Sequence, residues 1–234
     1  VSTKSNHLES YKSALSCDPI SAFGGIVSCN FKITKNLALE LNKLFLEVII
    51  ANGFESSAIK ILKAKKNLRL IDGTNYTSEE ILKFVSFNQN IMIQSEDLNL
   101  FSTKNFKIVS KRKPTSKQLK DLIFAFNVCR YVKSNAIVLA SNETTVGIGS
   151  GQPSRLDSCQ IAINKMKKFN LQNDNLVAAS DAFFPFVDGI EKLVQSGVRA
   201  VVQPSGSIRD KEIINFANET DTVLLFSKTR HFRH

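Results

Sequence analysis

Short apolar runs alternate along this chain with segments that have the spacing of amphipathic helices. The clearest runs are residues 48–51, 176–178, 198–202 and 223–226. Such short runs, apolar at nearly every position, are typical of strands buried on both faces of a parallel sheet. With helical segments between them, they predict an α/β fold. A chain of 234 residues is long enough for one large α/β domain or two smaller ones.

Local signals add further elements to this pattern. Thr34 is the predicted N-cap of one helix, and Thr115 or Ser116 is the predicted N-cap of a longer one. Residues 77–85 have a weaker helical pattern, and residues 91–94 read as a short strand. The run at 48–51 is expected to be a fully buried parallel strand.

A basic segment that contains a proline, residues 111–114, precedes the longer helix. Such a segment is a natural link between two compact parts. We therefore expect a domain boundary here, with a first half at residues 1–113 and a second half at residues 114–234.

Charge and cysteine content limit the possible functions. The net charge of +10 suits a polyanionic partner, but the lysines are scattered over helical segments, and no nucleic-acid-binding motif accompanies them. We expect no nucleic-acid partner, although an anionic small molecule would benefit from the same field. The four cysteines form no metal-binding pattern, so we predict reduced thiols and no metal. No apolar run is long enough for a membrane span, and we expect a cytoplasmic protein.

The segment at residues 179–189 (ASDAFFPFVDG) lies where a strand gives way to a helix, the position at which α/β sheets bind ligands. Its three phenylalanines could form an apolar wall for a flat ring, with Asp181 and Asp188 as polar groups on either side. The alternative is a helix start buried against the sheet, because aromatic clusters are more often core than site.

Three other segments have two interpretations each. The pair Gly24–Gly25 either lets a backbone approach a ligand or makes an ordinary turn. The run at 147–155 (GIGSGQPSR) either presents backbone N–H groups and Arg155 to an anion or carboxamide, or makes a tight strand-to-helix connection. The basic end at 227–234 either folds into a cleft or is a solvated terminus.

Six motifs, in this order and spacing, resemble the AICAR transformylase domain of bifunctional purine biosynthesis enzymes. The motifs are DPISAFGG at 18–25, KSN at 133–135, GIGSGQPSR at 147–155, SDAFFPF at 180–186, PSGS at 204–207 and RHFRH at 230–234. The resemblance covers essentially the whole chain. Enzymes of this family also carry an IMP cyclohydrolase domain, which is absent here.

The resemblance implies transfer of the formyl group of 10-formyltetrahydrofolate, the co-substrate, to the 5-amino group of AICAR. This amine is a poor nucleophile, so the reaction needs a base and stabilisation of the developing oxyanion. In the family an adjacent Lys-His pair has these roles, and its motif would lie upstream of Val1. We therefore expect this chain to be a C-terminal fragment without a catalytic residue. By itself the fragment is expected to lack formyl-transfer activity.

The resemblance also implies which residues contact the two substrates. The expected AICAR contacts are Gly24, Glu47, Asn135, Arg155, Phe183 and Arg230. The expected folate contacts are Leu156, Asp188, Ser207 and Ile208. Phe183 would be a stacking wall, Asn135 and Arg155 would contact the carboxamide, and Arg230 would contact the phosphate.

The fold implied by the resemblance is two cytidine-deaminase-like α/β/α halves without zinc. It further implies a homodimer whose active sites use both subunits, and it leaves a monovalent cation near the tail possible. Two rivals remain: a non-catalytic nucleotide-binding module of the same fold, and a basic protein that binds nucleic acid in a salt-dependent way.

Overall fold

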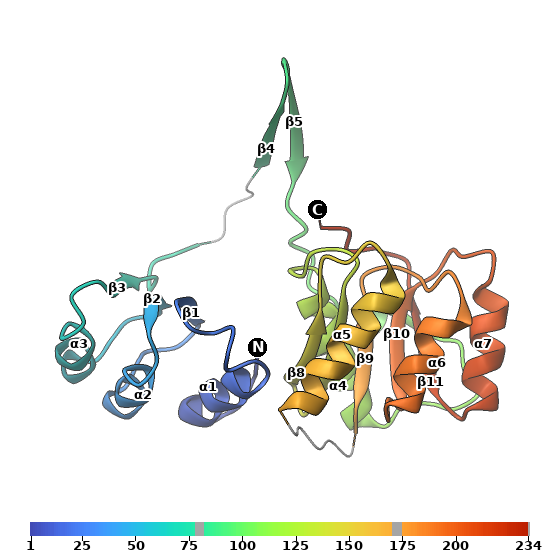
Figure 1. Cartoon of the computed structure of the whole chain (residues 1–234), viewed down its shortest axis with the longest axis horizontal. Helices are drawn as coiled ribbons and strands as arrows, with labels where there is room; N and C mark the ends of the chain where they lie inside the picture. Colours follow the sequence, from blue (N-terminus) through green and yellow to red (C-terminus); the bar gives the residue numbers. More distant parts are fainter. Residues whose placement is uncertain (78–81, 170–174, 234) are drawn as a thin grey trace. The chain divides into compact units, whose positions relative to one another are not determined.

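The computed structural model of the chain describes residues 1–77, 82–169 and 175–233. The chain divides into two compact units (Figure 1). Unit 1 consists of Val1–Lys4, Lys12–Asp18 and Asn99–His234. Unit 2 consists of Ser5–Tyr11 and Pro19–Leu98. Both units combine helices with strands, which confirms the α/β prediction.

Unit 1 is built on a six-stranded mixed sheet with the strand order β6-β11-β10-β9-β7-β8. Its strands are β6 (Phe106–Ile108), β7 (Ile137–Ser141), β8 (Thr144–Gly149), β9 (Val177–Ser180), β10 (Ala200–Pro204) and β11 (Val223–Ser227). Its helices are α4 (Ser116–Cys129), α5 (Arg155–Lys168), α6 (Val187–Gln195), α7 (Asp210–Glu219) and the short 3₁₀ helix η1 (Thr103–Asn105). Thr115 caps α4 as predicted, because its hydroxyl accepts the N–H of Gln118.

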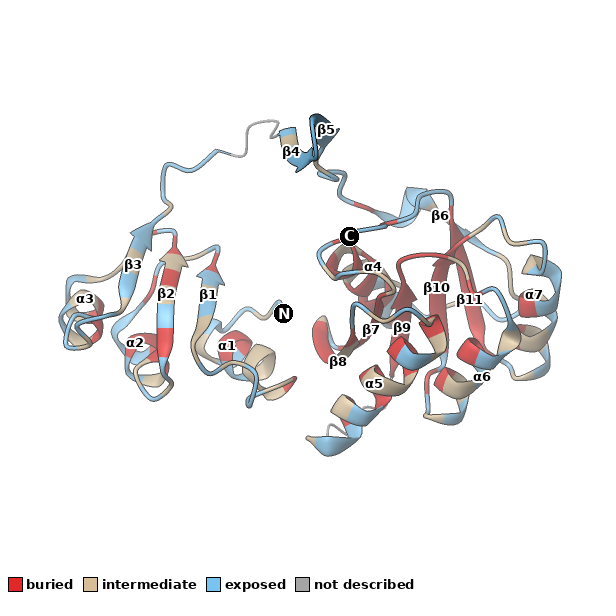
Figure 2. Ribbon diagram, turned by 45° about the horizontal axis from the view of Figure 1, so that its top comes forward, coloured by how far each residue is buried: buried red, intermediate tan, exposed pale blue. Residues whose placement is uncertain are grey.

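Alternate residues of the unit 1 strands enter two different cores. In β7, Ile137 and Leu139 pack with residues of α5, α6 and α7, whereas Val138 and Ala140 pack with residues of α4. Figure 1 shows α5, α6 and α7 on one side of this sheet. All residues of β7, β9, β10 and β11 are buried (Figure 2). The apolar runs at 176–178, 198–202 and 223–226 are therefore strands covered on both faces.

Unit 2 contains a three-stranded parallel sheet with the order β1-β2-β3. Its elements are β1 (Gly25–Cys29), α2 (Lys35–Leu41), β2 (Leu46–Ala51), α3 (Ser56–Leu62), β3 (Arg69–Asp72), β4 (Leu82–Phe87) and β5 (Asn90–Ser95). Helix α1 (His7–Ser16) begins in unit 2 and ends in unit 1. Thr34 caps α2 through a bond from the N–H of Leu37, as predicted.

The sheet of unit 2 is buried less completely than predicted. Ile49 and Ala51 of β2 are buried, but Val48 and Ile50, which point to the other face, are only half-buried, and Glu47 is exposed. The expectation of a parallel strand at 48–51 is confirmed, and the expectation that it is fully buried is wrong. One face of this sheet therefore lacks the second covering layer that the sheet of unit 1 has.

Strands β4 and β5 form a separate antiparallel hairpin. The helix predicted at 77–85 is wrong where it is described, because β4 begins at Leu82; residues 78–81 lie outside the described residues. Asn88 in the connecting turn has a φ of +52°. Asparagine tolerates this conformation, which tight hairpin turns need. The turn and the pairing with β5 explain why a strand forms here.

Residues 99–113 belong to unit 1, since β6 pairs with β11 in its sheet. The division of a transformylase domain into residues 1–113 and 114–234 stays a prediction. Within the described ranges, no helix combines the length and apolar character that a membrane crossing requires.

Candidate functional site

The topology of unit 1 brings three loops to one edge of its sheet. Strand β9 ends at Ser180, and its antiparallel neighbour β7 starts at Ile137, so the two residues are paired. Strand β8 is antiparallel to β7, and its last residue, Gly149, also pairs with Ile137. The segments before β7, after β8 and after β9 therefore meet. These segments carry Asn135, the loop into α5, and the phenylalanines that precede α6.

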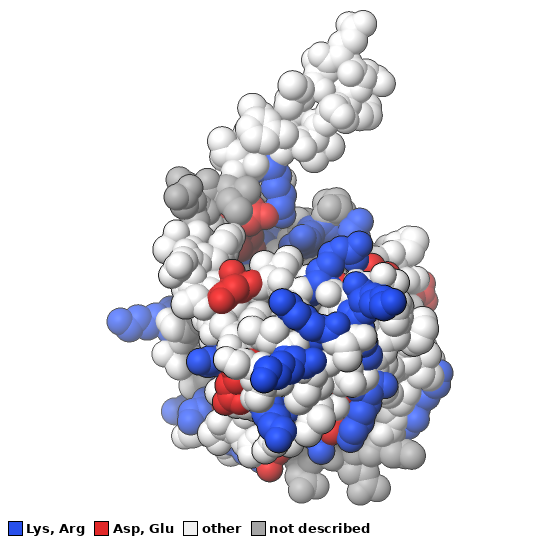
Figure 3. Space-filling model, turned by 90° about the vertical axis from the view of Figure 1, so that its left-hand side faces the viewer, with Lys and Arg blue, Asp and Glu red and all other residues white. Residues whose placement is uncertain are grey.

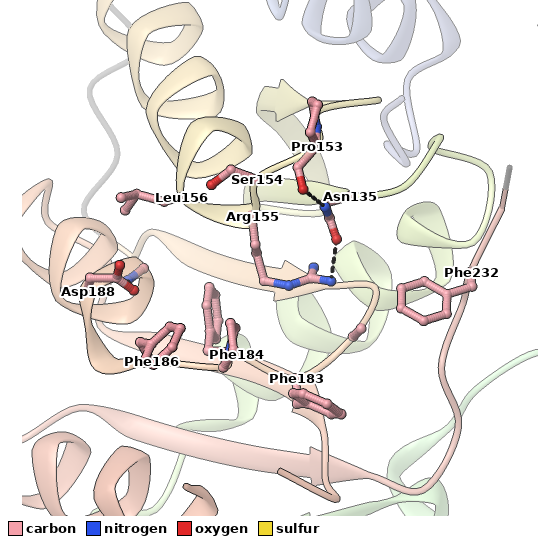
Figure 4. Close-up of a pocket in the computed structure, with 13 residues that line it drawn as sticks. Asn135, Pro153, Ser154, Arg155, Leu156, Phe183, Phe184, Phe186, Asp188 and Phe232 are labelled. Atoms are coloured by element: carbon pink, nitrogen blue, oxygen red, sulfur yellow. Dashed lines mark hydrogen bonds between the residues drawn. The ribbon is translucent and has the colours of Figure 1, made fainter. Parts of the chain in front are cut away.

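Arg155, the first residue of α5, is the centre of a buried polar network. Its Nη1 donates to Ser180 Oγ at 2.8 Å and pairs with the Asp181 carboxylate, and its Nη2 donates to Asn135 Oδ1 at 2.8 Å. Asn135 in turn donates its Nδ2 to the carbonyls of Gln152 and Pro153, both at 2.9 Å. Figure 4 shows its bonds to Pro153 and Arg155. A buried, paired and hydrogen-bonded charge is held in one orientation.

The Asp181 carboxylate was predicted to lie beside the phenylalanines, and it does not. It is fully buried and binds Arg155 on one oxygen and Ser134 Oγ, at 2.5 Å, on the other. Its role in this structure is to hold Arg155 and the segment before β7. Asp188 does lie beside the phenylalanines, with Oδ1 accepting the N–H of Gly189 at 2.7 Å.

The three phenylalanines divide between the two interpretations of their segment. Phe184 is buried in the unit 1 core, whereas Phe186 is half exposed and Phe183 is partly exposed. A Cβ on Gly189 would stand 2.6 Å from the Phe184 ring, so only glycine lets α6 pack this closely. Phe184 thus anchors the segment, and Phe183 and Phe186 are free to contact a ligand.

The basic end of the chain folds onto this site. The backbone N–H of His231 donates to the carbonyl of Asp181 at 2.8 Å, and Ser134 N–H donates to the carbonyl of Arg233 at 2.9 Å. The His231 ring is buried, with its centroid 4.5 Å from that of Phe126. These contacts place the Arg230 guanidinium 5.4 Å from the centroid of the Phe183 ring. Up to Arg233, the segment is therefore docked on unit 1 through His231 and backbone hydrogen bonds, although Arg230 and Phe232 stay exposed.

These elements surround a pocket of about 410 Å³. Five predicted contact residues line it, namely Asn135, Arg155, Leu156, Phe183 and Asp188. The remaining lining residues are Pro153, Ser154, Ala182, Phe184, Pro185, Phe186, Gly189 and Phe232. Figure 4 shows the phenylalanines and Arg155 arranged around this space. A volume of this size, with aromatic walls and a few polar groups, suits a small organic ligand.

Gly147 and Gly149 allow close packing between β8 and α5. A Cβ on Gly149 would stand 1.9 Å from the carbonyl oxygen of Ser158, and one on Gly147 would stand 2.2 Å from that of Ala162. Both glycines are therefore required for α5 to lie directly against β8. Gly151 has a φ of +68° in the turn that leads to α5, a conformation that favours glycine.

Two predicted folate contacts, Ser207 and Ile208, are not among the pocket-lining residues. The Ser207 hydroxyl accepts the backbone N–H of Arg209, and the Ile208 side chain is fully exposed. Their loop nevertheless reaches the pocket wall, because the Arg209 guanidinium lies 4.8 Å from the centroid of the Phe186 ring.

Gly24 and Glu47 are neighbours in unit 2. The N–H of Gly24 donates to the carbonyl of Phe45 at 2.9 Å, and a Cβ on Gly24 would stand 4.0 Å from Glu47 Oε1. Gly24 has a φ of +70°, and the N–H of Gly25 bonds to the carbonyl of Ala22, so the glycine pair makes a turn. The Phe23 and Phe45 rings contact each other beside it, tilted by 40° and with centroids 5.0 Å apart.

Some contributors to the site were missed from the sequence. Phe232 lines the pocket, and Ser134 bonds to Asp181, although both lie inside motifs singled out above. Ser134 and Phe232 are 98 residues apart, so no local sequence pattern indicates that the tail contacts the start of β7. Burial raises the pKa of Cys159 to about 12, and burial, with the Asp181 charge second, raises the pKa of Cys129 well above its usual value, so both nearby thiols stay protonated near neutral pH.

Comparison with known proteins shows the family to which the chain belongs. The model of a family described as the AICARFT/IMPCHase bienzyme matches residues 1–165. The chain belongs to this family. Similarity to individual members extends over the whole chain, including the segments around Phe183 and Arg230 that follow residue 165.

The relatives are proteins named bifunctional purine biosynthesis protein PurH. The protein of Buchnera aphidicola subsp. Schizaphis graminum is 46% identical over 100% of this chain and 45% of its own length. That of Aquifex aeolicus is 43% identical over 100% of this chain and 46% of its own length. That of Persephonella marina is 43% identical over 97% of this chain and 44% of its own length. The chain thus spans a little under half the length of these relatives.

Proposed function

We propose that the chain acts in purine biosynthesis as the substrate-binding part of an AICAR transformylase. In this reaction a formyl group passes from 10-formyltetrahydrofolate to the 5-amino group of AICAR. The observation that supports this most is the pocket itself. It brings together Asn135, Arg155 and Phe183, expected from the resemblance to contact AICAR, with Leu156 and Asp188, expected to contact the folate.

In this proposal each pocket residue has a physical role. The Phe183 ring stacks on the imidazole ring of AICAR, and Arg230, beside the same ring, pairs with its phosphate. Arg155 uses three hydrogen bonds within the described residues to hold its position, and a guanidinium has five N–H donors. The remaining donors face the carboxamide. Leu156 and Asp188 contact the folate from the other wall.

Among the residues that the structure describes, those that line the pocket include neither lysine nor histidine. Formyl transfer to a weakly nucleophilic amine needs a proton acceptor and a donor for the oxyanion. We propose that a Lys-His pair outside this chain supplies both. Further substrate contacts come from Gly24, Glu47, Ser207 and Ile208. In this proposal the two units correspond to cytidine-deaminase-like halves, and the enzyme is cytoplasmic.

Calorimetric titration of the chain with AICAR tests the binding role. Phe183→Ala removes a stacking partner and should weaken binding by about 1–3 kcal/mol, or roughly 5- to 150-fold. Phe169→Ala, the same change at the end of α5 and away from the pocket, should leave the affinity unchanged. Equal affinities for the two variants would reject Phe183 as the ring-binding wall.

A formyl-transfer assay then separates the enzyme from a non-catalytic nucleotide-binding module. The chain is compared with a version extended upstream to include the expected Lys-His segment. Turnover by the extended chain only supports the proposal. Tight AICAR binding by both chains without turnover by either would favour the binding module.

A further inference from the structure

Two of the three phenylalanines in the pocket wall lie beside an arginine. The Arg230 guanidinium is 5.4 Å from the centroid of the Phe183 ring, and the Arg209 guanidinium is 4.8 Å from the centroid of the Phe186 ring. Each pair combines a flat apolar surface with a cation, a combination that suits a ring bearing an anionic arm. The proposed function uses the first pair for AICAR and leaves Arg209 without a role.

Phe186 lies on the side of the pocket where the folate is expected. Figure 4 shows Leu156 and Asp188, two expected folate contacts, on the same side of the pocket as Phe186. The Phe186 side chain stays 51% exposed although Arg209 lies over its ring. A second aromatic ring can therefore still stack on it. Folates have such a ring, the aminobenzoyl ring, between the pteridine and a glutamate tail.

The charges of the pocket lining do not suit the glutamate tail. Among the described lining residues, only Arg155 and Asp188 are charged. Arg155 is already paired with the buried Asp181, and Asp188 would repel a carboxylate. Beyond the lining, Arg230 is assigned to the phosphate of AICAR. Arg209 at the pocket rim therefore remains as the positive partner of the tail.

Arg209 is held in place and is accessible to a ligand. Its backbone N–H donates to Ser207 Oγ at 3.1 Å, and the Asp210 carboxylate accepts the N–H groups of Gly206 at 2.8 Å and Ser207 at 3.2 Å. The Arg209 side chain is 48% exposed and pairs at 3.3 Å with Glu212, which is 54% exposed. An exposed ion pair of this kind is weak, so a ligand carboxylate can replace Glu212.

The general positive charge of the chain cannot replace a placed arginine. Figure 3 shows lysines and arginines scattered over one face of the molecule among uncharged residues. The field of a chain with a net charge of +10 attracts any anion without orienting it. A guanidinium presents paired N–H donors in one plane, a geometry that matches a carboxylate. Arg209 therefore adds selectivity to attraction.

We propose that Arg209 binds a carboxylate of the glutamate tail of the folate co-substrate, while the adjoining aminobenzoyl ring stacks on Phe186. This inference rests on the proposed function, because it requires a folate in this pocket. Arg209 selects co-substrates with an anionic tail over those that end in a neutral group. The inference also gives Ser207 and Ile208, which precede Arg209 in its loop, a place beside the tail.

Calorimetric titration of the full chain with two ligands tests the proposal. The ligands are tetrahydrofolate, kept reduced under nitrogen, and tetrahydropteroyl amide, in which an uncharged carboxamide replaces the glutamate. The parent chain should bind tetrahydrofolate about 5- to 20-fold more tightly than the amide. Arg209→Gln should abolish this preference and leave the affinity for the amide unchanged. A parent chain without the preference, or a variant that keeps it, overturns the proposal.

Arg199→Gln is the matched control. Arg199 is exposed and precedes β10, whereas Arg209 lies in the segment that follows the other end of this strand. The control removes the same charge and should keep the preference for tetrahydrofolate. If Arg199→Gln lost the preference as Arg209→Gln does, the field of the whole chain would be its cause and the proposal would be wrong.

Glu212→Gln tests the same contact in the opposite direction. This change removes the residue that competes for Arg209 and a negative charge that repels the tail. Tetrahydrofolate should bind about two- to fourfold more tightly to this variant, with no change for the amide. Unchanged or weaker binding of tetrahydrofolate would contradict the proposal.

Titration with AICAR separates two kinds of failure. If AICAR and both pteridine ligands bind but the glutamate adds no affinity, the proposed function stands and the role of Arg209 is rejected. If neither AICAR nor tetrahydrofolate binds, the proposed function is rejected and the role of Arg209 is rejected with it.

Discussion

Both sheets of this protein contain strands rich in apolar residues, but the two sheets are buried to different extents. Strands β7, β9, β10 and β11 of unit 1 are buried at every position, between α4 on one face and three helices on the other. The sheet of unit 2 has a buried face with Ile49 and a second face on which Ile26 and Ile71 are exposed. An apolar strand sequence therefore does not by itself show how many layers cover it.

This difference has a functional consequence. A sheet covered on both faces holds its loops rigidly, and unit 1 uses that rigidity to fix Arg155, the phenylalanine segment and the tail around one pocket. Unit 2 keeps apolar surface available, most of all on its hairpin. Unit 1 therefore holds the candidate site, whereas the exposed apolar side chains of unit 2 gather on β4 and β5.

The largest expected effect compares the same deletion in the two cores. Ile137 and Ile49 are both fully buried. Ile137→Ala in unit 1 should lower the free energy of unfolding by about 4 kcal/mol, and Ile49→Ala in unit 2 by about 2 kcal/mol, because a layer open on one side can collapse into the cavity. Urea unfolding, with hydrogen exchange followed separately in each unit, measures both. Equal losses would show that the two cores are equally rigid.

Ion pairs provide the next comparison. Asp181→Asn leaves the buried Arg155 charge without its carboxylate and should cost about 3 kcal/mol. Glu96→Gln breaks the partly exposed Lys83 pair of unit 2 and should cost less than about 1 kcal/mol. Urea midpoints of the two variants give the comparison. A loss below about 1 kcal/mol for Asp181→Asn would mean that water or another group compensates Arg155.

The alkylation rates of one buried thiol in each unit should also differ. Burial raises the pKa of Cys29 in unit 2 to about 11 and that of Cys159 in unit 1 to about 12. Both thiols are therefore protonated at pH 8, and Cys29 has about ten times the thiolate fraction of Cys159. Alkylation of the folded chain, followed by peptide mass spectrometry, should modify Cys29 first and accelerate as the pH rises toward 11. Faster modification of Cys159 would indicate that unit 1 opens more readily.

Helix caps are expected to differ least. Thr115 of unit 1 forms a reciprocal capping box with Gln118, whereas Thr34 of unit 2 accepts one longer bond, of 3.4 Å, from Leu37. Thr115→Ala should cost about 1 kcal/mol and Thr34→Ala about 0.5 kcal/mol. Ser154→Ala is the control, because the Ser154 side chain makes no capping bond to α5. Thermal unfolding measures all three, and a larger loss at Thr34 would reverse the expected order.

Much of unit 1 could be predicted from local patterns. The strand at 176–178, the helix after Phe186 and the Thr115 cap depend on residues close in sequence, so their periodicity and capping signals suffice. The helix predicted at 77–85 is wrong at residues 82–85, because pairing between β4 and β5 outweighs a weak helical spacing. Asp181 was misplaced for a related reason: a carboxylate next to an aromatic segment looks the same whether it faces a ligand or a buried arginine.

The sequence by itself determined most of the order of helices and strands, the motifs that place the chain in its family, and five of the thirteen residues that line the pocket. Only the tertiary structure decided that Phe184 is core while Phe183 is wall, that Arg155 is held by Asp181, and that the tail docks through His231. It also decided which apolar strands are buried on both faces, on one face or on neither. The physical reason is that secondary structure depends on near neighbours, whereas burial depends on layers supplied by distant segments.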